Sequence, residues 1–584
     1  MLDVVGVEPD AALLDGWRAR VERGRTYLGW SDMRTTAAGR ESAVARVHAD
    51  GVSLAVAAPV DQLFTATELN EWALAATLLA RDPARWVDLE AAMIRDAANS
   101  ATPPAIAPVL DDAAAMTRLK HLSQLEARPD LVALIDAAHA RDLPWLLDED
   151  VLTLGAGIGH IDLPLDALPP VGDIGWPSLH DVPTAVVTGS NGKTTTVRLI
   201  AACARAHGWR TGYNCTDGLF LDGSLITAGD YSGPVGARSV LRDRRVQAAV
   251  LETARGGILR RGLAVSQAQV AVVTNVSSDH FGEYGIHDLD ALAAVKLVVA
   301  NLLGADGLLV VNADDPLLRA RAASTGRPLG WFARDADDAL LLAHRAQDGA
   351  TAGVRAGRLV AGLRGQQEDL GAIDAMPLTV DGSAAYNVAN LAAAALASLA
   401  LGITAATIAA VYARFGAEAS DNPGRLMRYE VGGVLMLMDY AHNPDGLRGL
   451  LEVARHLRAS GRLALVLGQA GNRQVGDIEQ LAATAAEARP DLIVIKETEG
   501  FLRGRAPGEV PAILRAALLG GGYPESALPM RLSEVDAVRA ALGWARAGDV
   551  LALPVHARVA RNEVISLIER MRRNGWRAGQ ALPG

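Results

Sequence analysis

The segment TGSNGKT at residues 188–194 limits the folds open to this chain more than any other stretch. It follows the short apolar run TAVV at residues 184–187, which predicts a buried strand, and it precedes residues 197–206, which favour a helix. A strand, a glycine-rich turn carrying Lys-Thr, and a helix form the context that a phosphate-binding loop requires. The sequence therefore predicts an α/β domain with a phosphate site at this turn, and a ligand-free glycine turn is the alternative.

The loop residues have distinct expected roles. Gly189 and Gly192 permit positive φ angles and bring backbone N–H groups close to phosphate oxygens, and the helix N-terminus adds partial positive charge. Lys193 would reach the β- and γ-phosphates, and Thr194 would offer its hydroxyl to Mg²⁺. ATP or GTP is the expected ligand. The loop residues expected to complete its site are Ser190, Asn191 and Thr195.

Composition and charge narrow the class of protein. With 584 residues, half of them apolar, the chain has room for three or four domains with sizeable cores. A net charge of −11 argues against nucleic acid or an anionic membrane surface as the main partner. The two cysteines are too few for a disulfide framework or a thiolate zinc site. No signal peptide and no membrane-length apolar run is evident, so we expect a cytoplasmic protein.

Three domains are predicted along the chain. Residues 1–175 form an α+β domain of unknown role, with a hairpin around Asp50-Gly51 and a Pro/Gly-rich linker at 164–177. Residues 176–422 alternate short apolar strands with helices, which predicts a parallel sheet and a central ATP-binding domain. The alternation restarts after Pro423 and predicts a smaller Rossmann-like domain over 423–584. The whole chain is therefore classed as multi-domain α/β.

Polar residues follow several predicted strands, where parallel sheets place their ligands. Glu252 could hold Mg²⁺ opposite Thr194, although a helix-capping acid is the alternative. His280 could bind a second divalent ion as a neutral imidazole, or be structural. Lys296 lies in an apolar helix predicted over 289–303, where it could snorkel to solvent. In a low-dielectric site its neutral amine could instead take up CO₂ as a carbamate and supply an oxygen ligand.

Taken together, these motifs resemble those of the Mur ligases, ATP-dependent amide ligases that build peptidoglycan precursors and are related to folylpolyglutamate synthases. The resemblance covers roughly residues 180–584. The motifs that carry it, in family order, are TGSNGKT at 188–194, Glu252, NVSSDH at 275–280 followed by Lys296, NADDP at 312–316, YNVAN at 386–390, PGR at 423–425 and DYAHNP at 439–444.

A closer resemblance is to the Mur-like portion of cyanophycin synthetases. It rests on TDG at 216–218, LETARGGILR at 251–260, DYAHNP at 439–444, and RGR at 503–505 with Gly508-Glu509. In that family this portion attaches arginine to an aspartyl side chain, and a preceding ATP-grasp module extends the aspartate backbone. About 180 residues precede the loop here, too few for that module as well, so one ligation is expected. Tyr386 also favours this branch, because peptidoglycan ligases usually have His there, whereas Asn472 departs from the Asp of many relatives.

The resemblance implies the remaining assignments. Two Mg²⁺ ions are expected, one at Thr194 and Glu252 and one at His280 and carbamylated Lys296, with Lys193, Glu252, His280 and Lys296 acting in catalysis. Nucleotide contacts are expected from Asn387, Arg425 and Asp439, and substrate contacts from Arg255, His442 and Asn443.

The implied reaction phosphorylates a carboxylate to an acyl phosphate, which an amine then attacks. The expected partners are an amino acid, with a basic one as the first candidate, and a carboxylate-bearing peptide or polymer; homo-oligomerisation is left open. Two alternatives stand. One is a non-catalytic nucleotide-binding partner of a full-length polymer synthetase. The other is a ligase of the folylpolyglutamate or peptidoglycan type.

Overall fold

The computed structural model describes residues 1–30, 42–48, 51–99, 109–278, 286, 288–498 and 500–583. The chain divides into two compact units. The smaller unit consists mainly of Met1–Leu154 and Asp162–Ser178, and the larger consists of Gly155–Ile161 with most of the chain from Leu179 onward.

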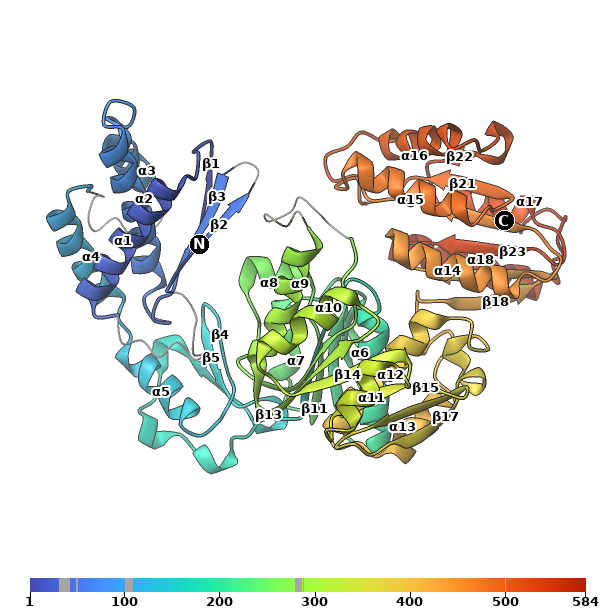
Figure 1. Cartoon of the computed structure of the whole chain (residues 1–584), viewed down its shortest axis with the longest axis horizontal. Coiled ribbons are helices and arrows are strands. Elements are labelled where there is room, and N and C mark those ends of the chain that lie inside the picture. Colours follow the sequence, from blue (N-terminus) through green and yellow to red (C-terminus); the bar gives the residue numbers. More distant parts are fainter. Residues whose placement is uncertain are drawn as a thin grey trace. The chain divides into compact units, whose positions relative to one another are not determined.

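The smaller unit joins an antiparallel sheet to a layer of helices. The sheet order is β1 (Leu2–Val5), β3 (Gly51–Val56), β2 (Ala43–His48), and β2 pairs with β3 as the predicted hairpin. Helices α1 (Ala11–Leu28) and α2 (Leu63–Arg81) pack on the sheet, and α4 (Asp112–Glu126) packs on both (Figure 1). In the core, the Trp17 ring N–H donates to Asn70 Oδ1 at 2.9 Å. This unit has the expected α+β character.

The segment expected to be a Pro/Gly-rich linker is structured instead. It contains three short 3₁₀ helices at Leu165–Ala167, Val171–Asp173 and Trp176–Ser178. The elements that precede it are the helices α3 (Leu89–Asn99) and α5 (Pro129–His139) and a sheet of β4 (Trp145–Leu147), β5 (Val151–Leu154) and β6 (Ile161–Pro164). The Trp176 ring N–H donates to the Val171 carbonyl at 2.9 Å, and the Arg141 guanidinium lies over the same ring. Each proline fixes φ, and the indole holds the turns together.

The larger unit is built on a long mixed sheet with a parallel centre. Its order is β10-β9-β8-β11-β7-β12-β13-β14-β15-β16-β17, and the strands from β8 to β15 in that order are parallel. Antiparallel hairpins, which the sequence pattern did not predict, extend it at both ends. The strand bounds are β7 (Thr184–Thr188), β8 (Thr211–Cys215), β9 (Gly218–Leu221), β10 (Ser224–Ala228), β11 (Ala248–Glu252), β12 (Ala268–Val273), β13 (Leu303–Asn312), β14 (Leu329–Asp335), β15 (Ala350–Arg355), β16 (Arg358–Gly362) and β17 (Glu368–Ala372).

Helices α6 (Lys193–His207), α12 (Ala385–Ala400) and α13 (Ala405–Tyr412) share one continuous apolar core with this sheet. The alanines of α12 let it pack closely against α6 and the strands. The helix predicted over 289–303 is shorter: α9 (Leu289–Leu297) continues as a 3₁₀ turn at Val298–Leu302, where two β-branched valines disfavour α-helix. The other helices are α7 (Pro234–Leu241), α8 (Arg255–Arg261), α10 (Pro316–Arg321) and α11 (Ala339–Arg345).

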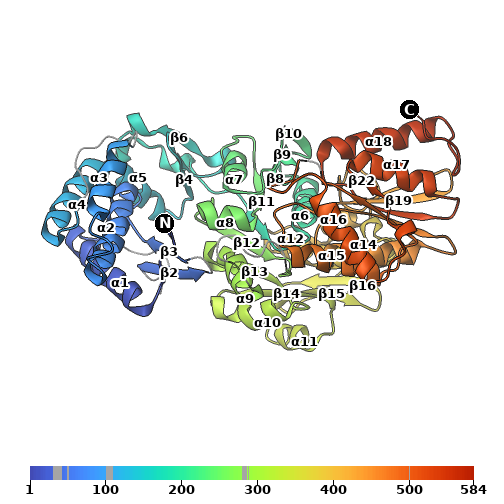
Figure 2. The same ribbon diagram turned by 90° about the horizontal axis from the view of Figure 1, so that it is seen from above.

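From Met427 onward the chain forms a second, smaller sheet of order β18-β19-β23-β20-β21-β22, parallel except for the edge strand β18. Helices α14 (Pro444–Leu457), α15 (Val475–Glu487) and α16 (Glu509–Gly520) pack on one face, and α17 (Glu534–Trp544) and α18 (Arg558–Arg573) on the other (Figure 2). The strands are β18 (Met427–Val431), β19 (Val434–Asp439), β20 (Leu463–Leu467), β21 (Leu492–Lys496), β22 (Met530–Arg531) and β23 (Val550–Pro554). The predicted Rossmann-like arrangement is confirmed.

A buried ionic cluster holds the loop after β19. Glu534 accepts hydrogen bonds from Lys496 and from the backbone N–H groups of His556 and Ala557. Lys496 Nζ lies 3.1 Å from His556 Nδ1, which must accept, so Nε2 carries the hydrogen and donates to the Ala441 carbonyl at 3.0 Å. Burial, and then the charge of Lys496, lower the pKa of His556 to about 4, so the imidazole is neutral near pH 7.

We predict that Lys496→Met destabilises this part of the chain by about 3–5 kcal/mol, because it leaves the Glu534 carboxylate buried without its cation. Scanning calorimetry of the full chain would measure the effect. The double variant Lys496→Met/Glu534→Gln removes both charges and should recover most of the lost stability. A double variant as unstable as the single one would contradict this account.

Candidate functional site

The glycine-rich loop connects β7 to α6 as predicted. Gly192 is the N-cap residue of α6 with φ +82°, and Gly189 has φ +149°. A Cβ on Gly192 would lie 2.2 Å from Asn390 Oδ1, and one on Gly189 would lie 1.8 Å from Thr274 Oγ1. Both the backbone angles and the close neighbours therefore require glycine at these positions.

The segment after β12 is hydrogen-bonded to the glycine-rich loop. Asn275 Oδ1 accepts from the Asn191 N–H at 2.9 Å, and the Asn275 carbonyl accepts from the Ser190 N–H at 3.0 Å. The Thr274 hydroxyl donates to the Asn191 carbonyl at 2.6 Å, and the Ser190 hydroxyl donates to the Ser277 carbonyl at 3.0 Å. Residues 274–277 therefore hold the loop in shape, while Asp279 and His280, the predicted ligand of a second metal, lie outside the described residues.

Three oxygen-bearing side chains meet beside the loop. The Thr194 hydroxyl donates to Glu252 Oε2 at 2.8 Å. The Thr216 hydroxyl lies 2.9 Å from Thr194 Oγ1 and donates to Glu252 Oε1 at 3.4 Å. Carboxylate and hydroxyl oxygens suit Mg²⁺, so the donor set at Thr194 and Glu252 fits this ion. Within the described ranges, no group of three or more His, Cys, Asp or Glu side chains gathers as a metal cluster.

Glu252 is 1% exposed, and burial raises the pKa of its carboxyl group. The charge of Lys193, the hydrogen bond from Thr194 and the charge of Arg425 act in the opposite direction. Lys193 itself lies over the loop, where Nζ donates to the carbonyls of Gly189 at 3.0 Å and Ser190 at 3.1 Å. A cation and a buried carboxylate thus flank the turn.

The loop after β19 reaches the phosphate loop through Asn443. Its amide donates to Asn191 Oδ1 at 2.9 Å, while its own Oδ1 caps α14 by accepting from the Gly446 N–H at 2.9 Å. Asp439 accepts from the Leu426 N–H at 2.7 Å. His442 is held by backbone contacts: its carbonyl accepts from Gln469 at 3.0 Å, and its ring nitrogen Nδ1 lies 3.1 Å from the Tyr440 carbonyl. The nucleotide and substrate roles of these residues stay predictions.

Asn390, which was not among the predicted site residues, is the asparagine of α12 that touches the loop. It lies against Gly192, and the Thr196 hydroxyl is 3.5 Å from its Oδ1. The predicted Asn387 instead donates to the Leu378 carbonyl at 3.0 Å and accepts from Asn390 at 3.1 Å. Both belong to the YNVAN motif, three residues apart on one helix face.

The other predicted residues are placed as follows. Lys296, 3% exposed, lies in α9, and Arg255 is the buried first residue of α8. The Arg425 guanidinium lies 4.4 Å from the centre of the Tyr440 ring. The Thr195 hydroxyl accepts from the Asn422 amide at 3.2 Å, which connects α6 to the segment preceding β18. Asn422 carried no recognisable signal in the sequence.

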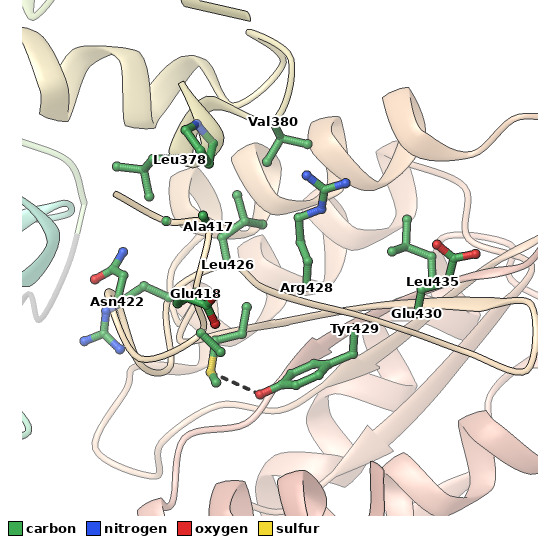
Figure 3. A pocket seen from close by; sticks show the side chains of 15 residues that line it. Leu378, Val380, Ala417, Glu418, Asn422, Leu426, Arg428, Tyr429, Glu430 and Leu435 are labelled. Carbon is green, nitrogen blue, oxygen red and sulfur yellow. Dashed lines mark hydrogen bonds between the residues drawn. The ribbon is translucent and has the colours of Figure 1, made fainter. Parts of the chain in front are cut away.

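A cavity of about 280 Å³ lies at that segment (Figure 3). Leu378 and Val380 line it from one side and Arg428 and Glu430 from β18, where the Tyr429 hydroxyl also approaches the Met427 sulfur at 4.0 Å. Arg425 and Asn422 line it as well, but none of its lining residues belongs to the glycine-rich loop. The cavity is thus a feature of the connection between the two sheets.

Two parts of the chain match domains of one known protein family. Residues 187–398 match the Mur ligase middle domain, and residues 424–553 match the Mur ligase glutamate ligase domain. A UDP-N-acetylmuramoyl-L-alanyl-D-glutamate--2,6-diaminopimelate ligase from Xanthomonas campestris pv. campestris is 33% identical over 375 residues, 62% of this chain and 70% of that protein. The chain belongs to the Mur ligase family.

Within the family it is similar to cyanophycin synthetases. The protein of that name from Crocosphaera subtropica is 37% identical over 357 residues, 60% of this chain and 40% of that protein. The chain therefore spans about two fifths of the length of these relatives. Among solved structures, E. coli FolC in complex with ADP aligns with a TM-score of 0.48 and 20% identity, covering 67% of this chain and 90% of that one. None of the described helices has the length and apolar character needed to cross a bilayer.

We predict that Glu252→Gln stabilises the metal-free protein at pH 8 and that its advantage shrinks toward pH 5. Because the folded-state pKa of Glu252 is raised, folded protein keeps a proton that the unfolded chain has already lost. The stability of the parent therefore falls as the pH rises from the unfolded-state pKa of Glu252 toward its higher folded-state pKa. Glutamine does not ionise, so the variant does not lose this stability. Thermal melts in EDTA across pH measure the difference, and an offset that does not vary with pH would refute it.

Proposed function

We propose that the protein is an ATP-dependent amide ligase that joins an amino acid to a carboxylate-bearing acceptor through an acyl phosphate. The observation that carries the proposal is the cluster of Lys193, Thr194 and Glu252 at the carboxyl ends of parallel strands. Such a cluster combines a phosphate cradle, a cation and oxygen ligands for Mg²⁺. Membership of the Mur ligase family and similarity to cyanophycin synthetases support it.

In the proposed reaction, a carboxylate oxygen of the acceptor attacks the γ-phosphorus of ATP and ADP leaves. The amino group of the second substrate then attacks the acyl carbon, phosphate leaves with the original carboxylate oxygen, and the nitrogen loses a proton to give the amide. Lys193 and the backbone N–H groups of the loop would stabilise the negative charge on the transferred group. Mg²⁺ held by Thr194 and Glu252 would add to that stabilisation.

The contact between Asn443 and Asn191 supports a second part of the proposal. It joins the loop after β19 to the phosphate loop itself. A joined pair of loops would keep water from the acyl phosphate and orient the two substrates. We assign Asn387, Arg425 and Asp439 to the nucleotide, and His442, Asn443 and Arg255 to the substrates or the shape of their site. We also propose residues 176–422 and 423–584 as the two catalytic domains, and residues 1–175 as a further domain.

Burial of Lys296 supports the proposal that its amine becomes a carbamate. A lysine amine that loses its charge on burial is nucleophilic and can add CO₂. The carbamate would then be an anionic oxygen ligand for a second Mg²⁺, with His280 as its partner.

Arginine and an aspartyl peptide are the first substrates to test, because a cyanophycin synthetase is among the relatives, at 37% identity. ADP release should be measured for each amino acid paired with Asp-containing peptides, and the product identified by mass. A folate and a nucleotide-sugar peptide serve as alternative acceptors for the other family chemistries. ATP binding without stimulated ADP release from any pair would favour the non-catalytic nucleotide-binding partner.

We predict that Lys193→Ala lowers ADP release at least about 100-fold while the melting temperature stays near that of the parent. The lost ammonium is the cation expected at the transferred phosphoryl group. Lys120→Ala is the matched control, because Lys120 is exposed on α4 in the smaller unit. Near-full turnover in Lys193→Ala would refute the assignment of the phosphate loop.

We predict that Lys296→Ala loses activity and that small carboxylic acids such as acetate restore part of it, because they can replace the carbamate oxygens. Lys296→Arg should stay inactive in bicarbonate, since a guanidinium does not form the carbamate. Chloride at equal ionic strength is the control for acetate. Parent-level activity of Lys296→Ala would refute the carbamate.

A further inference from the structure

The turn between β8 and β9 carries two side chains with different partners. Cys215 pairs with Gly218 in the antiparallel ladder, so Thr216 and Asp217 alone form the turn. Thr216 faces Thr194 and Glu252 in the candidate magnesium site. Asp217 faces two arginines. Because the turn is so short and both its ends are hydrogen-bonded to each other, a displacement of Asp217 also displaces Thr216.

Each carboxylate oxygen of Asp217 accepts from an arginine of a different part of the chain. Arg198 of α6 donates to Oδ2 at 2.8 Å, and Arg561 of α18 donates to Oδ1 at 2.9 Å. Both arginines are buried, and the Asp217 side chain is 15% exposed. Ion pairs this well shielded from water are screened far less than surface pairs, and both partners must be in place for the carboxylate to be satisfied.

The two arginines also contact the segment that leads into β18. Arg198 donates to Asn422 Oδ1 at 3.1 Å and to the Pro423 carbonyl at 3.0 Å. Arg561 lies against Gly424, where an added Cβ would be 2.2 Å from its Nη1. Burial would raise the pKa of Asp217, but the charges of Arg425, Arg198 and Arg561 hold it below its usual value. Asp217 therefore stays ionised at the point where α6, α18 and this segment meet.

We propose that Asp217 is a positioning residue that couples the placement of α18 to the geometry of the candidate magnesium site. With α18 docked, Arg561 and Arg198 hold the carboxylate between them, and the turn presents the Thr216 hydroxyl to Thr194 and Glu252. When the Arg561 contact is lost, the turn loses one of its two anchors and the Thr216 hydroxyl is no longer held. The inference rests on the proposed function in that Thr194 and Glu252 bind the metal of the nucleotide.

The proposed coupling has a consequence that distinguishes it from a purely structural ion pair. Arg561 has no described contact with Thr194, Thr216 or Glu252, yet its loss should weaken the binding of Mg²⁺ with ATP. A bridge that only stabilises the fold would lower the melting temperature and leave the metal-dependent part of nucleotide affinity unchanged. The two roles are therefore separable by measuring affinity for a fluorescent ATP analogue with Mg²⁺ and with EDTA.

The experiment compares the parent with Arg561→Met, Asp217→Asn, the double variant and Thr216→Val. In the parent, Mg²⁺ should increase the affinity for the ATP analogue. We expect this increase to be about 5–10-fold smaller in Arg561→Met and in Asp217→Asn, while their affinity in EDTA stays within about 2-fold of the parent. The double variant should lose no more of this increase than either single variant, because Arg561 and Asp217 act on Thr216 through one chain of contacts. Thr216→Val should show the same loss. Arg558→Met, an exposed arginine at the start of α18, is the matched control and should behave as the parent.

Three results would overturn the inference. These are full Mg²⁺-dependent tightening in Arg561→Met, losses that multiply in the double variant, or an equal loss of affinity in EDTA. A parent that binds no nucleotide in either condition would overturn the proposed function itself. A parent that binds normally, with variants that match it, would overturn the coupling alone.

Discussion

The close approach of Asn390 and Thr274 to the backbone of the glycine-rich loop is the constraint on which the site depends. A side chain at Gly192 or Gly189 would occupy the space of those two polar groups. With glycine in both places, the loop lies between α12 and the end of β12. Hydrogen bonds with Thr274 and Asn275 hold the loop, and the Thr196 hydroxyl of α6 donates to Asn390 of α12. Its shape is therefore set by neighbours that are distant in sequence, and α6 begins from a turn already fixed in position.

Acidic and basic side chains lie close together around this turn. The carboxylates of Glu252, Asp217 and Asp439 are each influenced by Arg425, and Lys193 adds its own charge at Glu252. Ions buried this deeply are costly unless they are paired. The proposed binding of a polyphosphate with its metal requires these side chains at fixed positions, and their hydrogen bonds with hydroxyl, guanidinium and backbone N–H groups hold them there.

The sequence predicted those features that local pattern determines. Continuous apolar strands indicate a parallel sheet, and the parallel pairing of β7 with β11 and β12 confirms it. The ligand sites expected at the carboxyl ends of these strands stay predictions. The hairpins at the two ends of the sheet have no clear sequence signal, because short exposed strands such as β10 lack the apolar alternation of buried ones. The sequence does not distinguish Asn387 from Asn390 as the neighbour of the loop, because both lie on one helix face and only packing decides which of them reaches it. The Arg198–Asp217–Arg561 bridge leaves no periodic signal.

The contact between Arg561 and Asp217 joins residues that are 344 positions apart. During synthesis, β7, the loop and α6 leave the ribosome long before α18 exists. The glycine-rich loop can therefore form early, from local turns and neighbouring strands, while the arrangement around Asp217 requires a helix that is synthesised hundreds of residues later. A nascent chain with a folded glycine-rich loop but no α18 would lack the Arg561 contact of the turn, so the order of translation itself delays completion of the candidate site.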